Sequence, residues 1–270
     1  LPLDLIRACP TKCNTKVQRP DFCSRAELQG AEKQRYVAKL FSRISGRYDL
    51  MNDLMTLGLH RRWKRWTAQV AAQNLQGLAI DVSSGTGDLA LELAKRPGIC
   101  HAVGLDLLLE MTSRANQKIS SRGMSRVITM MSGDSLSLPF SDDSFACATA
   151  GFSLRNMPDI EKALSEMVRV IRPGGRVAIL ELSPMKPSIK STLFRPVFHY
   201  LVPLVGRLVA GDHSAYSYLP KSVDYFLDAD RLASILTGLG LEKVNYQRFG
   251  FGTVAVHWGI KSTTKVSNPG

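Results

Sequence analysis

Two acids and two glycines lie close together in residues 81–88, which read Asp-Val-Ser-Ser-Gly-Thr-Gly-Asp. An apolar run, residues 78–80, precedes this stretch, and residues 89–95 follow it with the composition of a helix. Gly85 and Gly87 are therefore expected in a turn between a strand and a helix, where the absence of a side chain lets a ligand approach the backbone closely. Turns of this kind are typical of proteins that bind a nucleoside-containing cofactor.

Two cofactors fit the spacing of this turn. Residues 85–90, Gly-Thr-Gly-Asp-Leu-Ala, satisfy the dinucleotide pattern that ends in glycine or alanine, and Asp106 follows about 20 residues later, as a ribose-binding acid would. The pyrophosphate of NAD, however, would lie on the helix N-terminus, where a carboxylate repels it. Asp81 closes the strand and Asp88 opens the helix, so the charges favour S-adenosylmethionine (SAM), which carries a sulfonium and an ammonium group. The alternative is that Asp88 only caps the helix.

Strand and helix patterns alternate along the middle of the chain. We expect strands at residues 78–80, 101–106, 126–131, 145–150 and 176–181, with helices at 89–95, 108–119 and 160–171. This alternation predicts an α/β fold built on a doubly wound, mostly parallel sheet. Residues 242–249 and 253–261 are expected to finish the sheet as an antiparallel C-terminal strand pair.

Four of the candidate site residues fall at the ends of predicted strands. They are Asp81, Asp106, Asp134 and Gly151. Ligands of doubly wound sheets bind outside the carboxyl ends of the strands. We therefore expect these four residues to meet in one crevice, and their agreement is a stronger signal than any single motif.

The sequence predicts one main domain, residues 31–261, between a loose N-terminal extension, residues 1–30, and a frayed tail, residues 262–270. Residues 31–75 have helical apolar spacing and are expected to form the N-terminal helices, in which Trp63 and Trp66 share a face that packs on the core. Residues 190–225 are expected to form a helical cover over the cleft. No apolar run in the sequence reaches the length of a membrane span.

The charge of the chain is uneven. The net charge is +12, and residues 1–77 alone hold fourteen basic and six acidic residues. This asymmetry favours an anionic partner, a membrane surface ahead of nucleic acid, with solubility alone as the alternative. The five cysteines form no paired framework, which favours a reducing, cytoplasmic compartment. The five histidines form no metal-binding constellation, so no metal is expected.

Several motifs, in order along residues 33–261, resemble the SAM-dependent C-methyltransferases of ubiquinone and menaquinone biosynthesis. The most specific are Arg-Tyr-Asp-Leu-Met-Asn-Asp-Leu-Met at 47–55, Gly-Leu-His-Arg-Arg-Trp-Lys-Arg at 58–65, Phe-Ser-Leu-Arg-Asn at 152–156 and Val-Ile-Arg-Pro-Gly-Gly-Arg at 170–176. The chain departs from the family pattern at Ser83 and Ser84, which replace Ala-Gly, and at Ser153, which replaces a frequent glycine. The resemblance implies the Rossmann-like fold of class I SAM-dependent methyltransferases.

The resemblance also implies where SAM lies. Thr86 would line its methionine part, Asp106 would bind the ribose hydroxyls, and Asp134 with Ser135 would flank the adenine. The whole set of expected cofactor-binding residues is Asp81, Gly85, Thr86, Gly87, Asp106, Asp134, Ser135 and Gly151.

The acceptor that the resemblance implies is the ring of a reduced polyprenyl quinone precursor, either demethylmenaquinol or 2-methoxy-6-polyprenyl-1,4-benzoquinol. A ring carbon becomes a good nucleophile only when a ring hydroxyl loses its proton. Arg155 is the first candidate near the acceptor. Its guanidinium cannot act as a base, so it would stabilise a phenolate or orient a water, and a salt bridge is the alternative. The further catalytic candidates are Tyr48, Asp212 and His199, the last of which would otherwise be a core histidine.

A polyprenyl tail and the basic N-terminal part both favour peripheral contact with an anionic membrane, at its inner face. No nucleic-acid partner is then expected, and a homodimer stays open. Two other functions also stay open on the sequence: methylation of another small molecule, and an NAD-dependent oxidoreductase reaction.

Overall fold

The computed structural model of the chain describes residue 28, residues 30–185 and residues 213–263. Two of the candidate residues for the acceptor site, His199 and Asp212, lie outside the described residues. So do residues 1–27 of the expected extension, the first part of the expected cover, and most of the expected tail.

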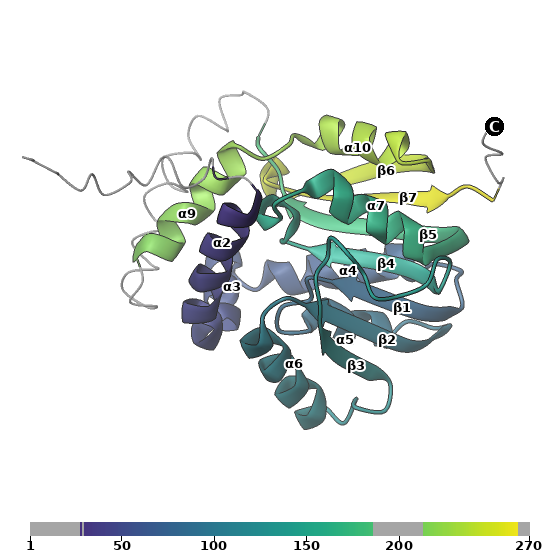
Figure 1. The fold of residues 1–270 in the computed structure, drawn as a ribbon, viewed down its shortest axis with the longest axis horizontal. Helices are drawn as coiled ribbons and strands as arrows, with labels where there is room; N and C mark the ends of the chain where they lie inside the picture. Colours follow the sequence, from purple (N-terminus) through teal and green to yellow (C-terminus); the bar gives the residue numbers. More distant parts are fainter. Residues whose placement is uncertain (1–27, 29, 186–212, 264–270) are drawn as a thin grey trace, which may run out of the picture.

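A seven-stranded sheet forms the centre of the molecule, in the order β3-β2-β1-β4-β5-β7-β6 (Figure 1). The strands are β1 (Gly77–Val82), β2 (Ile99–Asp106), β3 (Ile128–Ser132), β4 (Phe145–Gly151), β5 (Ile171–Leu182), β6 (Leu241–Phe249) and β7 (Val254–Lys261). The first five pair in parallel, and β7 lies antiparallel to both β5 and β6. The mostly parallel sheet with an antiparallel C-terminal pair, predicted from the sequence, is confirmed.

Helices cover both faces of the sheet because alternate residues of each strand point to opposite sides. One face carries α4 (Leu59–Ala72), α5 (Asp88–Ala94) and α6 (Leu109–Ser121), which pack on a cluster that includes Ala79 and Cys147. The other face carries α7 (Ile160–Val170) and α10 (Ala229–Gly238), which pack on the neighbouring strand residues Ile80 and Ala148. The three layers are those expected for a doubly wound fold.

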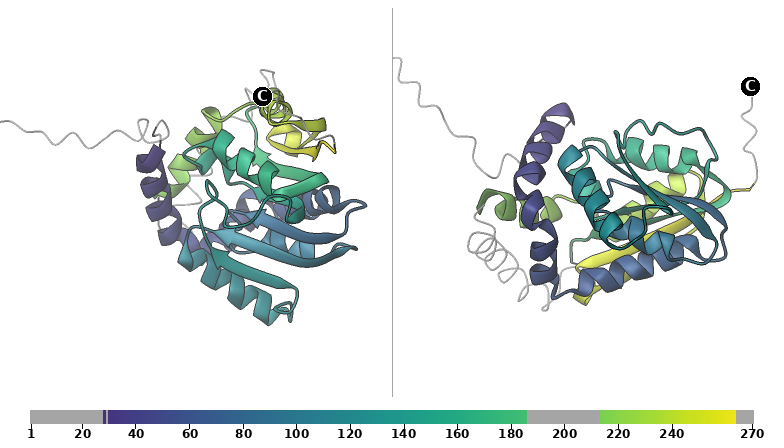
Figure 2. Two further views of the ribbon diagram at one scale, coloured as in Figure 1. Left: turned by 45° about the vertical axis from the view of Figure 1, so that its right-hand side comes forward. Right: turned by 90° about the horizontal axis from the view of Figure 1, so that it is seen from below.

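Three further helices lie beyond the carboxyl ends of the parallel strands: α2 (Gly30–Ile44), α3 (Tyr48–Thr56) and α9 (His213–Asp224) (Figures 1 and 2). They share a small core of their own, formed by Leu40, Ile44, Met51 and Tyr218. The α2 helix has a narrow apolar stripe and a polar outer face, so this contact buries the part of its surface that water solvates poorly. These three helices, called the cover below, therefore stand over the carboxyl ends of the strands, where ligands of such sheets bind.

The start of β5 differs from the sequence prediction. We expected Pro173-Gly174-Gly175 to separate α7 from a strand at 176–181, but the strand already begins at Ile171. Ile171 pairs with Phe145 and Arg176 with Cys147, so the residues between them form a bulge within the strand. Gly174 has a φ of 76°, which allows that bulge, and a Cβ on Gly175 would lie 2.7 Å from the carbonyl oxygen of Ala146.

Asp81 connects the middle of the sheet to the glycine turn. Its carboxylate accepts hydrogen bonds from the Thr149 hydroxyl of β4 at 2.8 Å and from the Ser84 hydroxyl of the turn at 2.5 Å. The side chain is buried, and burial raises its pKa to about 6 in spite of these two hydrogen bonds. The native state therefore binds the proton of the Asp81 carboxyl more tightly than the unfolded chain does.

We predict that Asp81→Asn changes how stability depends on pH. The pKa of the native carboxyl lies above its ordinary value, so this group stabilises the fold at low pH, and the contribution is lost as pH rises through about 6. The variant has no such group, so its free energy of unfolding relative to the wild type should rise by up to about 3 kcal/mol between pH 4 and pH 7.5. Urea unfolding at several pH values measures this difference. Asp159→Asn, at an exposed helix cap, is the control, and parallel pH profiles for Asp81→Asn and wild type would contradict the prediction.

Candidate active site

A cavity lies between the carboxyl ends of β1 to β4 and the cover helices α2 and α3. The strand ends and the loops that follow them contribute one wall. Those lining residues are Ser83, Gly85, Asp106, Leu107, Leu108, Asp134, Ser135, Gly151, Phe152, Ser153, Asn156, Met157 and Pro158. The opposite wall comes from helices, and its residues are Gln34, Val37, Ala38, Phe41, Tyr48 and Met111.

Three of the four strand-end residues expected to meet in one crevice line this cavity, namely Asp106, Asp134 and Gly151, and Asp81 does not. Of the residues predicted from the sequence, this cavity is lined by Tyr48, Gly85, Asp106, Asp134, Ser135 and Gly151. Four other predicted residues, Asp81, Thr86, Gly87 and Arg155, do not line it. These four belong to the surrounding structure that holds the lining residues in place, as the contacts of each one demonstrate.

The two glycines of the turn differ in what surrounds them. Both adopt left-handed backbone conformations, with φ of 57° at Gly85 and 81° at Gly87. A Cβ on Gly85 would meet only the Cε1 atom of Tyr48, at 4.0 Å, so this position leaves room for a ligand. A Cβ on Gly87 would lie 3.1 Å from the Cβ of Ala115, so the second glycine lets α5 approach α6 closely.

Asp106 closes β2 and fixes the glycine turn. Its Oδ2 accepts a hydrogen bond from the backbone N–H of Gly85 at 2.8 Å, and its Oδ1 accepts one from Leu108 at 2.9 Å. Burial raises the pKa of this carboxyl, while the two backbone hydrogen bonds act in the opposite direction. The carboxylate lies at the cavity wall, where its oxygens can also accept hydrogen bonds from the two hydroxyls of a ribose.

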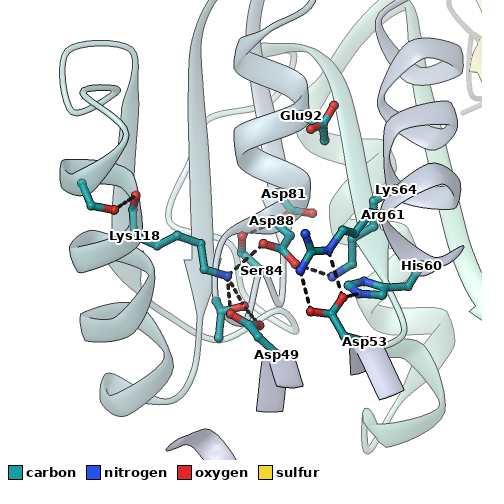
Figure 3. Close-up of polar contacts among 12 residues, drawn as sticks. Asp49, Asp53, His60, Arg61, Lys64, Asp81, Ser84, Asp88, Glu92 and Lys118 are labelled. Atoms are coloured by element: carbon teal, nitrogen blue, oxygen red, sulfur yellow. Dashed lines mark hydrogen bonds and ion pairs between the residues drawn. The ribbon is translucent and has the colours of Figure 1, made fainter. Parts of the chain in front are cut away.

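Asp88 does not supply a free negative charge to the cavity, so this part of the sequence argument for SAM over NAD is wrong. Its carboxylate lies between two ammonium groups, with Lys64 Nζ at 2.9 Å and Lys118 Nζ at 2.9 Å (Figure 3). Burial alone would raise the pKa of Asp88, but the two lysines outweigh burial and hold the pKa well below its ordinary value. The acids that remain at the cavity are Asp106 and Asp134.

The side chain of Thr86 is turned toward the cover. Its hydroxyl donates a hydrogen bond to Asp49 Oδ1 at 2.6 Å and accepts one from Lys118 Nζ at 3.0 Å. The hydroxyl is buried by these contacts and by the turn itself. A ligand would therefore meet Thr86 through the backbone of the turn, or after the hydroxyl exchanges Asp49 for the ligand.

The two lysines were not predicted from the sequence, although a local signal was present. Lys118 follows the buried residues Met111 and Ala115 at helical spacing, so it falls on the inner face of α6. Lys64 likewise falls on the buried face of α4, between His60 and Thr67. A lysine on the apolar side of an amphipathic helix requires a buried acid as partner.

Arg155 pairs with an acid, which was the alternative to a role in direct contact with the acceptor. Its Nη1 lies 2.5 Å from Glu181 Oε1 and donates to the carbonyl oxygen of Phe152 at 2.7 Å. Both members of this pair are buried. The Nε atom of Arg155 is also buried and has no hydrogen-bond partner in the described part of the chain.

The loop after β4 holds two unpaired polar atoms in residues that line the cavity. Ser153 Oγ and Asn156 Oδ1 are buried and have no hydrogen-bond partner among the described residues. Both residues line the cavity beside Phe152 and Met157. Buried polar atoms without a partner are costly, and a bound ligand with hydroxyl groups would satisfy them. Sequence analysis noted Ser153 only as a departure from a pattern and did not single out Asn156.

The cavity wall suits the adenosyl part of SAM at the ends of β1 to β3. The open backbone at Gly85, the Asp106 carboxylate and the pair Asp134 and Ser135 lie together there. Leu107, Leu108 and Met111 add an apolar surface of the kind on which an adenine ring packs. Within residues 30–185 and 213–263, no three His, Cys, Asp or Glu side chains are grouped in a way that could hold a metal ion.

Comparison with solved structures identifies the fold. A SAM-dependent methyltransferase of Thermotoga maritima matches with a TM-score of 0.58 at 16% identity, over 84% of this chain and 100% of that chain. The cyclase SpnF matches with a TM-score of 0.59 at 19% identity, over 76% of this chain and 82% of its own. The likeness extends to proteins with different reactions, so it defines the architecture and leaves the reaction to other evidence.

Sequence relatives are closer. The chain is 42% identical over 231 residues to a demethylmenaquinone methyltransferase of Roseiflexus castenholzii, covering 85% of this chain and 95% of the relative. It is 36% identical over 225 residues to the ubiquinone/menaquinone biosynthesis C-methyltransferase UbiE of Desulfotalea psychrophila, covering 83% and 90%. A profile of the ubiE/COQ5 methyltransferase family matches residues 29–261. With these matches extending over most of its length, the chain belongs to the ubiE/COQ5 methyltransferase family.

Proposed function

We propose that this protein transfers the methyl group of SAM to a ring carbon of a reduced polyprenyl quinone precursor, demethylmenaquinol or 2-methoxy-6-polyprenyl-1,4-benzoquinol. The observation that carries the proposal is one cavity lined both by Gly85 and Asp106, which would bind the donor, and by Ser153 and Asn156, which hold unpaired polar atoms and would bind the acceptor. The relatives named after demethylmenaquinone and after ubiquinone and menaquinone biosynthesis support this choice of acceptor.

The reaction needs a hydroxyl-bearing ring held beside the donor. Bound SAM supplies an electrophilic methyl group on a sulfonium. A C–C bond forms as the S–C bond breaks, and the ring carbon then loses its hydrogen as a proton. The side chains near the acceptor therefore have to orient the ring and favour the loss of a hydroxyl proton.

Asn156 and Ser153 are suited to that task. Asn156 Oδ1 is an acceptor without a donor, so it would take the hydrogen of a ring hydroxyl and orient the ring. Ser153 Oγ can donate to an oxygen that gains negative charge. In the proposed site the two groups bind one face of the quinol, and Tyr48 packs against it from the cover helix.

Arg155 is proposed to support this loop and to stabilise the charge that develops on the ring oxygen. Its pairing with Glu181 and with the Phe152 carbonyl fixes the loop from which Ser153 and Asn156 extend. An arginine side chain offers no proton acceptor in proteins, so Arg155 does not act as the base. Its Nε–H is buried without a partner in the described structure, and because Arg155 does not line the cavity, its positive charge would act on the ring oxygen from behind the lining residues.

A polyprenyl acceptor would be dissolved in a membrane, so the enzyme would have to reach the membrane surface. No helix in the described residues is long and apolar enough to cross a membrane. The cover nevertheless exposes a row of large apolar side chains, between 40% and 88% accessible, at Leu50, Leu54, Leu57 and Leu59. Exposed arginines of α4 lie next to this row in the sequence, at positions 61, 62 and 65. We propose that this leucine row meets an anionic membrane surface in which the polyprenyl tail is dissolved, so that a cytoplasmic protein works at the inner face.

Asn156→Ala should lower kcat for methyl transfer to the preferred quinol about 100-fold, because the ring loses its orienting acceptor. The KM for SAM should stay within about twofold, since Asn156 would bind the acceptor. The assay follows label from SAM into the two quinols. Asn116→Ala, an exposed asparagine on α6, is the matched control. Equal activity of Asn156→Ala and Asn116→Ala would remove Asn156 from the site.

The same assay on the wild type separates the functions that stay open. Label in one of the two quinols identifies the head group. No label in either quinol, with SAM bound in equilibrium dialysis, would reject the proposed acceptor in favour of another small molecule. Binding of NADH in place of SAM would instead support an oxidoreductase.

Leu57→Gln should weaken binding to anionic vesicles about tenfold, because an exposed leucine that enters the interface contributes about 1.5–3 kcal/mol. Vesicle flotation at constant salt measures the bound fraction. The control is Leu78→Gln. Leu78 is an exposed leucine at the amino end of β1, which is the end of the strand away from the cover. Equal binding of both variants, or a dimer in solution that covers the leucine row, would rule out the membrane as its partner.

A further inference from the structure

We propose that Asp49 is a positioning residue: it latches the cover helix α3 onto the glycine turn and thereby sets the rate at which the cofactor leaves. The latch consists of Asp49 on the cover, Thr86 in the turn and Lys118 on α6. Figure 3 shows Asp49 and Lys118 facing each other. This proposal rests on the proposed use of SAM, and it adds a residue outside the expected cofactor-binding and catalytic sets.

Both oxygens of the Asp49 carboxylate are used in the latch. Oδ1 accepts a hydrogen bond from the Thr86 hydroxyl at 2.6 Å, and Oδ2 lies 2.5 Å from Lys118 Nζ. Lys118 also donates to Thr86 at 3.0 Å, so the three side chains form a closed ring of contacts. Hydrogen bonds in which a partner is charged are stronger than neutral ones, so this contact orients α3 relative to the turn.

The latch is built on a fixed base. Lys118 Nζ also contacts Asp88 Oδ1 at 2.9 Å, and the other Asp88 oxygen accepts from Lys64 Nζ at 2.9 Å. The Lys64 side chain is only 10% exposed, whereas that of Asp49 is 40% exposed. Asp49 is therefore the member that water can most readily solvate if the cover moves, and Lys118 keeps Asp88 as a partner after Asp49 leaves.

A second acid on α3 forms a separate connection one turn later in the helix. Asp53 accepts from His60 Nε2 at 2.8 Å and from Arg61 Nε at 2.9 Å, which ties the end of α3 to the start of α4. The connecting residues Leu57 and Gly58 both have left-handed backbone conformations. Asp53 thus holds the α3–α4 turn and makes no contact with the glycine turn, so it provides a matched control for Asp49.

The latch controls the cavity through the residue before it. Tyr48 lines the cavity, and its ring is the nearest group to the open position at Gly85. Phe41 of α2 packs edge-on against Tyr48, with ring centroids 5.9 Å apart. While Asp49 is bound to Thr86 and Lys118, these rings stay at the part of the lining that would bind the donor. In this proposal a ligand such as SAM leaves the cavity past these two rings, so an intact latch slows its release.

The first test measures how fast bound S-adenosylhomocysteine leaves, by stopped-flow displacement without any quinol. Asp49→Asn should raise the dissociation rate about tenfold, because one charge-assisted contact is lost. Asp53→Asn should leave it within about twofold of the wild-type rate. In the methyl-transfer assay Asp49→Asn should raise the KM for SAM without lowering kcat. Equal dissociation rates for the two variants, or an unchanged rate for Asp49→Asn, would overturn the proposal.

The second test needs no ligand and so remains valid if SAM is not the cofactor. Hydrogen exchange of a peptide covering α3, residues 48–56, should be about tenfold faster in Asp49→Asn than in wild type. Unchanged exchange would show that the latch does not hold α3. Faster exchange together with a wild-type protein that binds no S-adenosylhomocysteine would keep the latch and reject the cofactor of the proposed function.

Discussion

The carboxylate of Asp88, held between two lysine ammonium groups, is the interaction on which the architecture of the site depends. Its partners come from α4 and α6, so one side chain at the start of α5 joins three helices on the same face of the sheet. A buried pair of this kind gains little net stability when complete, but removing one partner costs about 3–5 kcal/mol because a charge is left unpaired. The interaction therefore acts mainly as a constraint: α4, α5 and α6 must keep the arrangement in which both lysines reach Asp88. The glycine turn immediately precedes Asp88, so its position is constrained as well.

That constraint separates the charges of the site into two groups. The charge of Asp88 is neutralised by Lys64 and Lys118 on the helix side of the turn. Asp106 closes β2 at the cavity wall, where both of its carboxylate oxygens accept hydrogen bonds from backbone N–H groups. In the proposed site, selectivity for a cationic cofactor would depend on Asp106 and Asp134, which line the cavity. Lys118 connects the two groups, because it touches Asp88 below the turn and Asp49 on the cover. The position of the cover is thus coupled to the same lysine that fixes the turn.

The fold could be predicted largely from the sequence because its signals are local. Apolar runs gave the strands within a few residues, and the order of acids after them placed Asp106 and Asp134 at one cavity. The contacts that were not predicted join residues far apart in the chain. Lys64 and Asp88 are 24 residues apart, and Asp49 and Thr86 are 37 apart. No periodicity specifies such a pair. The early start of β5 was missed for another reason, since Pro173 and Gly174 normally end a strand and here form a bulge inside one.

The reaction has to be determined by the residues around the methyl acceptor, because the central sheet alone does not determine it. SpnF shares this architecture and is a cyclase, so the fold alone is compatible with different chemistry. Two parts of the chain outside the central sheet line the cavity: the loop after β4 and the cover helices. The loop places Ser153 and Asn156 at the cavity, supported by the buried Arg155–Glu181 pair. The cover adds Phe41 and Tyr48 as further apolar lining of the same cavity. A flat ring that carries hydroxyl groups at its edge matches both parts of the lining, and this match connects family membership to a quinol as the methyl acceptor.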